Sequence, residues 1–188
     1  MISATDCKKG TKIIFKDAPC TVIDYQHVKP GKGPAFVRIK MKNLISGLLY
    51  DSTFRSEEKF EQPDLEYRNM QYIYQDGDKY VFMDQEDYEQ VELNRSSIGD
   101  VINYIKEQVV YTILYWGERP IAITPPIHML LEVTETVPGV RGDTAQGGST
   151  KPATLETGLV LQVPLFINIG DSVKVDTRDG KYIERAKK

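Results

Sequence analysis

Hydrophobic and polar residues alternate with a period of two along much of the chain, and this period predicts short β-strands. The clearest case is segment 35–43, in which Val37, Ile39 and Met41 alternate with Phe36 and with basic residues. Successive side chains of a strand point to opposite faces of a sheet, so these three residues are predicted to face a core. Their neighbours are predicted to face solvent.

Turn signals between strand patterns predict β-hairpins. Asp-Gly is a strong signal, because glycine adopts the positive φ that tight hairpin turns require. The predicted strand–turn–strand units are 11–25 with a turn at 17–19, 70–84 with a turn at Asp76-Gly77, and 173–185 with a turn at Asp179-Gly180. The chain is therefore predicted to belong to the all-β class, with β-strands as its main secondary structure.

One segment, 97–106, is predicted to be helical. Ser97 and Asp100 have the spacing of a capping box, and an apolar face follows at Val101, Ile102 and Ile105. Gly99 makes such a helix less stable by about 1 kcal/mol relative to alanine, which counts against the prediction.

Two breaks divide the pattern into three parts of similar length, 1–64, 65–126 and 127–188. The first break lies at 62–64, where a strand pattern restarts, and the second at 124–126, where consecutive prolines exclude a central strand. Small closed barrels suit such lengths, because closure removes exposed strand edges. We therefore expect three small β-barrel domains.

Charge differs between these parts although the net charge is only −3. The first part carries 11 basic and 8 acidic residues, the second 5 and 11, and the third 8 and 8. A basic N-terminal part favours phosphate binding, and an acidic middle favours a face kept away from phosphate. Ordinary surface variation remains the alternative at this point.

Composition excludes several classes of protein. No apolar run is long enough for a transmembrane helix, and the N-terminus lacks the apolar core of a signal peptide. We therefore expect a cytoplasmic protein without a membrane partner. Two cysteines and two histidines make a zinc site improbable, and the cysteines are expected to be free thiols. No metal site and no catalytic residue is predicted.

The segment Pro30-Gly31-Lys32-Gly33-Pro34 is the most informative motif. Glycines permit a tight reversal and prolines restrict the loop, so one lysine is expected at a hairpin tip, directed away from the body. A plain turn is the alternative. Nearby basic residues favour phosphate contact; they are Lys29, Arg38, Lys40 and Lys42.

A second glycine-rich segment is a candidate backbone cradle for phosphate or nucleic acid. Its candidate residues are Gly142, Asp143, Thr144, Gly147 and Gly148. The alternative is an ordinary loop, and 139–152 is expected to be exposed and mobile because it offers little to bury. The acidic residues of 84–89 are expected to form a solvated surface, with a divalent cation site as the alternative.

These motifs together resemble the bacterial translation elongation factor P family over essentially the whole chain. VKPGKGPAF at 28–36 matches the family's loop, and 151–170 resembles its C-terminal signature. That signature is carried here by Lys151, Ala153, Gly158, Val163, Pro164 and Gly170. The glycine-rich segment and the ending DGKYIER also match.

The resemblance implies a KOW-type, SH3-like barrel at 1–64 and OB-type barrels at 65–126 and 127–188, in an elongated, tRNA-like shape. It implies a monomeric factor that is not an enzyme. Such a factor binds the ribosome, through both subunits, between the peptidyl-tRNA and exit sites. There it positions peptidyl-tRNA and relieves stalling at consecutive prolines.

The resemblance also implies roles for particular residues. Lys32 would reach towards the tRNA acceptor end, with Lys29, Arg38, Lys40 and Lys42 extending the contact to tRNA. The segment Gly142–Gly148 would face the small subunit and the exit-site codon, and Tyr182 and Arg185 match positions linked to ribosome contact.

The resemblance leaves open whether Lys32 is modified. No cofactor is expected. Family members with a lysine-type extension often lack the proline found here at Pro34, whereas some members with the two-proline loop work with unmodified lysine. If Lys32 is modified, the candidate groups are a lysine-type extension and an aminopentanol-type group, added by a lysine-modifying enzyme.

Two other classes are compatible with parts of the pattern. A generic OB-fold RNA-binding protein or RNA chaperone explains the strands and the basic end, but not the lone lysine between glycines and prolines. A metal-dependent enzyme using the carboxylates of 84–89 lacks recognisable ligand spacing.

Overall fold

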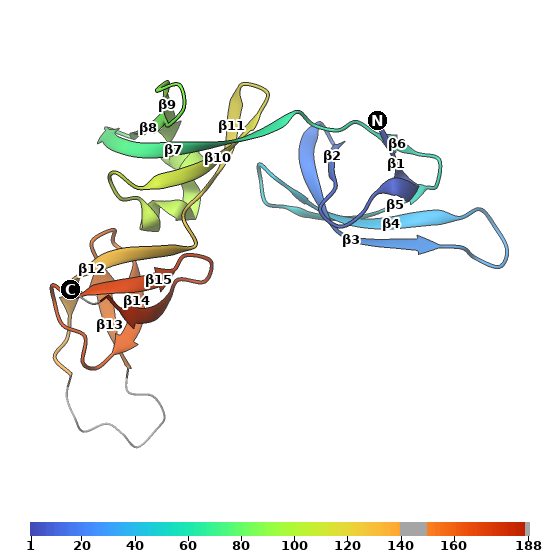
Figure 1. The fold of residues 1–188 in the computed structure, drawn as a ribbon. Helices are drawn as coiled ribbons and strands as arrows, with labels where there is room; N and C mark the ends of the chain where they lie inside the picture. The colour runs from blue at the N-terminus through green and yellow to red at the C-terminus, as the bar shows by residue number, and fades with distance from the viewer. Residues whose placement is uncertain (140–149, 187–188) are drawn as a thin grey trace, which may run out of the picture. The chain divides into compact units, whose positions relative to one another are not determined.

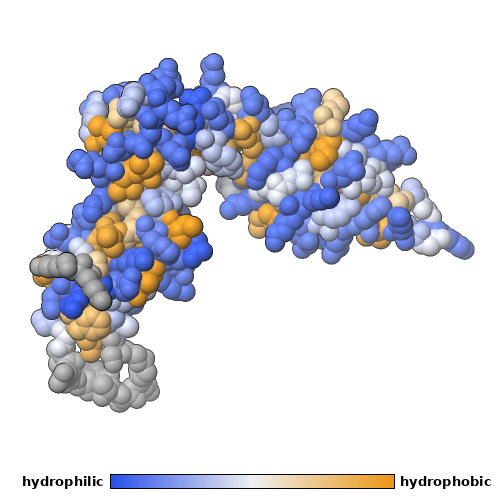
Figure 2. Space-filling model, in the orientation of Figure 1, coloured by the Kyte–Doolittle hydropathy of each residue, from blue (hydrophilic) through white to orange (hydrophobic). Residues whose placement is uncertain are grey.

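The computed structural model describes residues 1–139 and 150–186, and these are mostly β-strands (Figure 1). This confirms the predicted all-β class. The chain divides into two compact units, Met1–Arg68 with Ile113–Ala122 and Asn69–Thr112 with Ile123–Lys188. Among the described residues, no helix is long and apolar enough to cross a membrane. Hydrophilic residues predominate on the face drawn in Figure 2, and hydrophobic ones form separate groups there.

The N-terminal strands form a four-stranded antiparallel sheet in the order β2-β3-β4-β5, beside a small sheet of β1 and β6. Their bounds are β1 Ile2–Ser3, β2 Lys12–Phe15, β3 Ala18–Val28, β4 Phe36–Asn43, β5 Leu49–Arg55 and β6 Lys59–Phe60, with a short 3₁₀-helix η1 at Ala4–Asp6. Val37, Ile39 and Met41 on β4 are fully buried in the core, which confirms the predicted alternation. Free thiols of Cys7 and Cys20 lie in the same core.

The turn between β2 and β3 lies one residue earlier than predicted. Phe15 pairs with Ala18, so Lys16 and Asp17 form the turn, at φ 51° and 58°. Positive φ at both central residues is the geometry of a type I′ turn, whose twist matches that of the flanking strands. The predicted turn at 17–19 is therefore wrong by one position.

The central strands form a five-stranded sheet in the order β11-β10-β7-β8-β9. Their bounds are β7 Leu65–Asp76, β8 Lys79–Asp84, β9 Gln90–Asn94, β10 Val110–Trp116 and β11 Arg119–Thr124. The predicted hairpin within 70–84 is confirmed, but Asp76 pairs with Lys79 and the turn residues are Gly77 and Asp78. Gly77 supplies the positive φ, at 57°.

The predicted helix at 97–106 is wrong in both its start and its type. The structure has a single α-helical turn, α1 Arg95–Ile98, followed by the 3₁₀-helix η2 Gly99–Tyr104. Gly99, the first residue of η2, follows α1 at φ 58°, ψ −136°, and this conformation ends the α-helix. Ser97 lies inside α1 and therefore does not cap a helix beginning after it.

Tyr111 on β10 fixes the segment that follows η2. Its side chain is fully buried. Its hydroxyl donates to the Tyr104 carbonyl at 2.6 Å and accepts from the Lys106 amide at 2.9 Å. Tyr104 and Val109 pack against the core of the C-terminal strands within the second compact unit. One buried hydroxyl thus holds the backbone that carries this packing.

We expect Tyr111 to make folding stability fall at alkaline pH. Burial raises the pKa of its hydroxyl from about 10 to about 12, against the opposing effect of the Lys106 hydrogen bond. The folded state therefore keeps this proton more tightly than the unfolded state. The contribution of this protonated hydroxyl to the free energy of unfolding is complete below pH 10. It is lost as the pH rises towards 12, and the total loss is about 3 kcal/mol. Urea unfolding at pH 9 to 12 should show a smaller decline for Tyr111→Phe, and an identical decline would contradict this assignment.

The C-terminal strands form a second five-stranded sheet in the order β14-β13-β12-β15-β16. Their bounds are β12 His128–Thr136, β13 Thr150–Leu155, β14 Val160–Pro164, β15 Ser172–Asp176 and β16 Lys181–Arg185. The predicted hairpin within 173–185 is confirmed, with Asp176 paired to Lys181 and Gly180 at φ 68°.

The expectation of an exposed, mobile loop at 139–152 is wrong at its C-terminal end. Thr150 begins β13, and the Lys151 side chain is buried. The cause is strand pairing, because Lys151 pairs with Val163 and Pro152 with Gln162 of β14. Residues 140–149 lie outside the described part of the chain.

Candidate nucleic-acid interface

Lys32 lies in the loop that joins β3 to β4. The last pair of the two strands is Val28 with Phe36, and the residues from Lys29 to Pro34 are all exposed. The Ser56 hydroxyl donates to the Ala35 carbonyl at 2.9 Å and holds the end of the loop beside β4. Among the described residues, Lys32 has no ion-pair partner within 4.0 Å. A fixed hairpin thus presents an ammonium group that is free to meet an external anion.

The two glycines beside Lys32 differ in conformation. Gly33 has φ +112°, a value that side chains with a Cβ rarely adopt, whereas Gly31 does not lie in the positive-φ region. The conformational freedom that glycine supplies is therefore used at Gly33 and not at Gly31. A Cβ on Gly31 would meet nothing within 4 Å.

The basic residues of β4 share its outer face but differ in their charge partners. Arg38 donates to both carboxylate oxygens of Asp51, at 2.8 and 2.7 Å. This hydrogen bonding raises the pKa of Arg38 and lowers the pKa of Asp51. Lys40 lies opposite Asp51 and Asp24 on the neighbouring strands, whereas Lys42 lies opposite Thr21 and Leu49. Among the described residues, Lys42 is thus the member of this row that has neither an acidic residue directly opposite nor a hydrogen bond to one.

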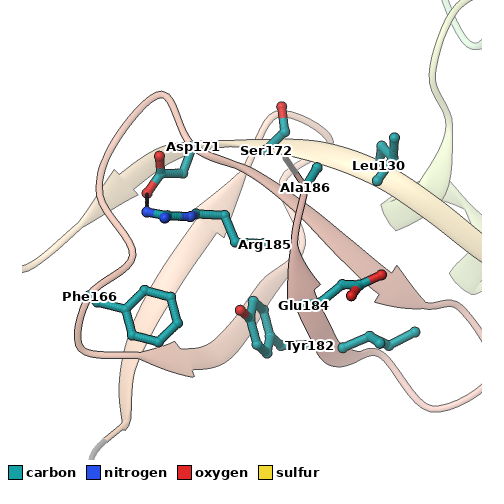
Figure 3. A pocket seen from close by; sticks show the side chains of 9 residues that line it. Leu130, Phe166, Asp171, Ser172, Tyr182, Glu184, Arg185 and Ala186 are labelled. Atoms are coloured by element: carbon teal, nitrogen blue, oxygen red, sulfur yellow. Dashed lines mark ion pairs between the residues drawn. The ribbon is translucent and has the colours of Figure 1, made fainter. Parts of the chain in front are cut away.

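Tyr182 and Arg185 line one pocket of about 950 Å³ at the outer edge of β16 (Figure 3). The Arg185 guanidinium lies 5.6 Å from the centre of the Phe166 ring, and its Nη1 lies 3.8 Å from Asp171 Oδ2. Burial raises the pKa of Tyr182, and its hydrogen bond with the Arg185 backbone opposes that shift. Two aromatic rings and a guanidinium can stack on bases or contact phosphate.

Phe166 was not identified from the sequence alone. It lies in the signature segment 151–170, two residues after the end of β14 at Pro164. In the structure Phe166 is 58% exposed. Its contact with Arg185 depends on the packing of β14 beside β16, which no local pattern reveals.

The other candidates are distributed differently. Gly142, Asp143, Thr144, Gly147 and Gly148 lie outside the described residues. In the acidic run, Asp84 is buried and accepts a hydrogen bond from the Glu86 amide at 2.7 Å, so the predicted solvated surface is wrong for Asp84. Within residues 1–139 and 150–186, no three His, Cys, Asp or Glu side chains are arranged to hold a metal ion.

Comparison with known protein families matches the chain in three consecutive segments. Residues 3–60 match the elongation factor P KOW-like domain, residues 65–123 the elongation factor P OB domain, and residues 129–185 the elongation factor P C-terminal domain. The segments follow one another in the order predicted from the motifs.

Curated relatives named elongation factor P are similar over their full length. The protein from Thermoanaerobacter sp. (strain X514) is 53% identical over 185 residues, covering 98% of this chain and 100% of the relative. The protein from Clostridioides difficile (strain 630) is 50% identical over the same coverage.

A solved structure supports the fold. Translation initiation factor 5A from Methanococcus jannaschii aligns with a TM-score of 0.55 and 23% identity, over 66% of this chain and 93% of that one. A generic OB-fold RNA-binding protein does not account for three ordered family matches. The chain belongs to the elongation factor P family and is a translation elongation factor.

Proposed function

We propose that this chain binds the ribosome between the peptidyl-tRNA and exit sites and speeds peptide-bond formation at consecutive prolines. The family is one of ribosome-associated translation factors, which supports the general setting. The observation that carries the finer proposal is the exposed Lys32 at a hairpin loop shaped by Gly33 and two prolines.

Chemistry explains why such a loop would help. Proline has a locked φ and a secondary nitrogen, so the geometry for attack on the peptidyl ester is hard to reach. Holding the peptidyl-tRNA end in place supplies orientation, which can contribute several kcal/mol to a rate. The Lys32 ammonium would contact backbone phosphates near the acceptor end. The factor itself would supply no catalytic group, metal or cofactor.

Other surfaces would extend this contact. Lys29, Lys40 and Lys42 would contact tRNA phosphates, and Arg38 would join them only in exchange for part of its pairing with Asp51. We also propose that the chain has three domains, at 1–64, 65–126 and 127–188. The third of these would contact the small ribosomal subunit. The contacting residues would be Gly142, Asp143, Thr144, Gly147, Gly148, Tyr182 and Arg185. The protein would act as a monomer in the cytoplasm.

Timing of synthesis through a Pro-Pro-Pro motif in a purified translation system tests the proposal. The protein would be recombinant and shown by intact mass to be unmodified. Acceleration supports the function and shows that the unmodified Lys32 suffices. If only protein isolated from its native cells accelerates synthesis, a lysine-modifying enzyme is a required partner. If neither form accelerates synthesis, the proposal is wrong.

Gly33→Val is expected to impair this acceleration far more than Gly31→Val. A valine at φ +112° carries backbone strain of about 1–3 kcal/mol, and the exposed loop can relieve it only by changing shape. Gly31→Val is the matched control, because the same side chain enters open space without a positive φ. Equal activity of both variants would show that the Gly33 conformation is not needed.

A further inference from the structure

Phe166 lies on a turn that the fold holds in place, and its ring nevertheless faces outward. The next residue, Ile167, is fully buried in the C-terminal core, and its amide donates to the Pro164 carbonyl at 3.1 Å. The Asn168 side-chain amide donates to the Phe166 carbonyl at 3.2 Å. The Phe166 ring remains 58% exposed. Single exposed hydrophobic residues are common, so the neighbours of this ring decide what it means.

A bulge in the edge strand β16 turns Tyr182 and Arg185 to the same face of the sheet. In a regular strand, residues three positions apart point to opposite faces. Here Tyr182 pairs with Val175 and Arg185 with Val173, and Ile183 is the extra residue on β16. Val173 and Val175 are two positions apart and both buried, so their partners share a face. Bulges at sheet edges often redirect a side chain in this way beside a functional site.

The turn and the bulge meet at the pocket described above (Figure 3). Arg185 lies against the Phe166 ring and beside Asp171. The same Asp171 oxygen accepts from the Asn168 amide at 2.8 Å, so the turn that carries Phe166 also fixes the carboxylate beside Arg185. Tyr182 lines the same pocket. Two rings and a guanidinium thus surround one space, and the fold holds each of them.

The charges around this space favour a nucleobase over a phosphate. Among the described residues that line the pocket, Asp171 and Glu184 are acidic and Arg185 is the cation. Arg185 already lies 3.8 Å from Asp171, and Lys174 lies 3.3 Å from Glu184. A phosphate would compete with one carboxylate for the guanidinium and approach another. A neutral base can stack on the rings and the guanidinium, and its amino group can donate to a carboxylate.

We propose that the pocket lined by Phe166, Tyr182 and Arg185 binds one unpaired RNA base by stacking. The inference rests on the proposed contact of 127–188 with the small ribosomal subunit. It names the group that this contact recognises, and it adds Phe166 to the contacting residues. The base is unpaired because a base inside a duplex is stacked on its neighbours, whereas single-stranded RNA can splay a base onto an aromatic side chain.

Titration of the full chain with the trinucleotide ApApA, followed by NMR of the backbone amides, tests which part of RNA the pocket binds. The second probe is an abasic analogue with the same phosphates. We expect ApApA, and not the analogue, to shift the amides of 182–186. The affinity read there should change by less than about twofold between 50 and 200 mM salt, because stacking releases no counterions. Phosphate contact at the Lys32 loop would instead shift 29–34 with both probes and depend strongly on salt.

Phe166→Ala should weaken the binding of ApApA about tenfold, which lies within the range for loss of one stacking ring. Phe166→Trp keeps a stacking surface and should bind at least as well as the parent protein. Ile169→Ala is the matched control, since Ile169 lies in the same segment, is 64% exposed and lies outside the pocket. All three variants should keep the parent melting temperature, because the side chains they change are exposed.

Two results would overturn the proposal. Equal shifts of 182–186 with ApApA and with the abasic analogue would make the pocket a phosphate site, and no shift with either would remove it as an RNA site. Parent affinity of Phe166→Ala would exclude stacking on that ring. Failure of the proposed function is recognised separately, because the parent protein would then not accelerate synthesis through Pro-Pro-Pro, whatever the titration shows.

Discussion

Lys32→Ala is expected to abolish the acceleration of synthesis through Pro-Pro-Pro and to leave the protein as stable as before. The lysine is exposed in a loop whose shape depends on Gly33 and the prolines rather than on the lysine side chain. Removing the ammonium therefore deletes the proposed contact with the acceptor end but little packing. Surface substitutions of this kind usually change stability by no more than about 0.5 kcal/mol.

Two measurements check this prediction together. The rate through Pro-Pro-Pro should fall to the rate without factor, while thermal unfolding stays unchanged. Lys29→Ala is the matched control in the same loop, and loss of one phosphate contact there should weaken binding by only a few-fold, in a salt-dependent way. Rescue by Lys32→Ala at the parent rate would remove the central residue from the mechanism.

The hydrophobic pattern predicted most of the fold because strand burial is a local property. On β4, each buried residue alternates with an exposed one, and the sequence shows this directly. The pattern locates turns less well than strands. Lys16 and Asp17, for example, adopt positive φ although neither is a glycine. There the pairing of Phe15 with Ala18 decides the turn, and that pairing is set by the register of the whole sheet.

Features that depend on strand register could not be predicted. Arg38 and Asp51 are 13 positions apart, and only the pairing of β4 with β5 brings them together. Without that pairing, the sequence indicates no partner for Arg38 and predicts that its guanidinium is free to bind phosphate. The predicted exposure of Lys151 is wrong for the same reason. Its glycine-rich and polar neighbours along the chain predict an exposed loop, whereas pairing with Val163 of β14 places it in the sheet.

The C-terminal signature mostly reflects the fold. Ala153 and Val163 are buried, and Gly158 and Gly170 have φ +86° and +85°. These residues identify the family because the sheet requires them. Among the described residues, those proposed to contact RNA are different ones, and local pattern says little about their role. They lie on the exposed loop after β3 (Lys29, Lys32), on the outer face of β4 (Arg38, Lys40, Lys42), on the turn after β14 (Phe166) and on the edge strand β16 (Tyr182, Arg185).

Phe82→Ala is expected to destabilise the central sheet by about 3–5 kcal/mol, the range for truncation of a buried phenylalanine. Phe82 on β8 is fully buried. Its ring lies 5.4 Å from the Tyr72 ring and 5.8 Å, edge to face, from the Tyr111 ring. Because the hydrogen bonds of the Tyr111 hydroxyl with Tyr104 and Lys106 hold that ring in place, the ring cannot easily move into the space left by Phe82. The cost should therefore lie towards the upper end of the range.

Urea unfolding followed by fluorescence measures this effect, because Trp116 is the one tryptophan of the chain and lies on β10 of the same sheet. Tyr74→Ala is the matched control, since Tyr74 lies on β7 but is 46% exposed, and its loss should cost far less. The N-terminal core is a separate cluster of residues, so amide exchange at β4 should stay slow in Phe82→Ala. Simultaneous loss of protection at β4 and β8 would show instead that the chain unfolds as one cooperative unit.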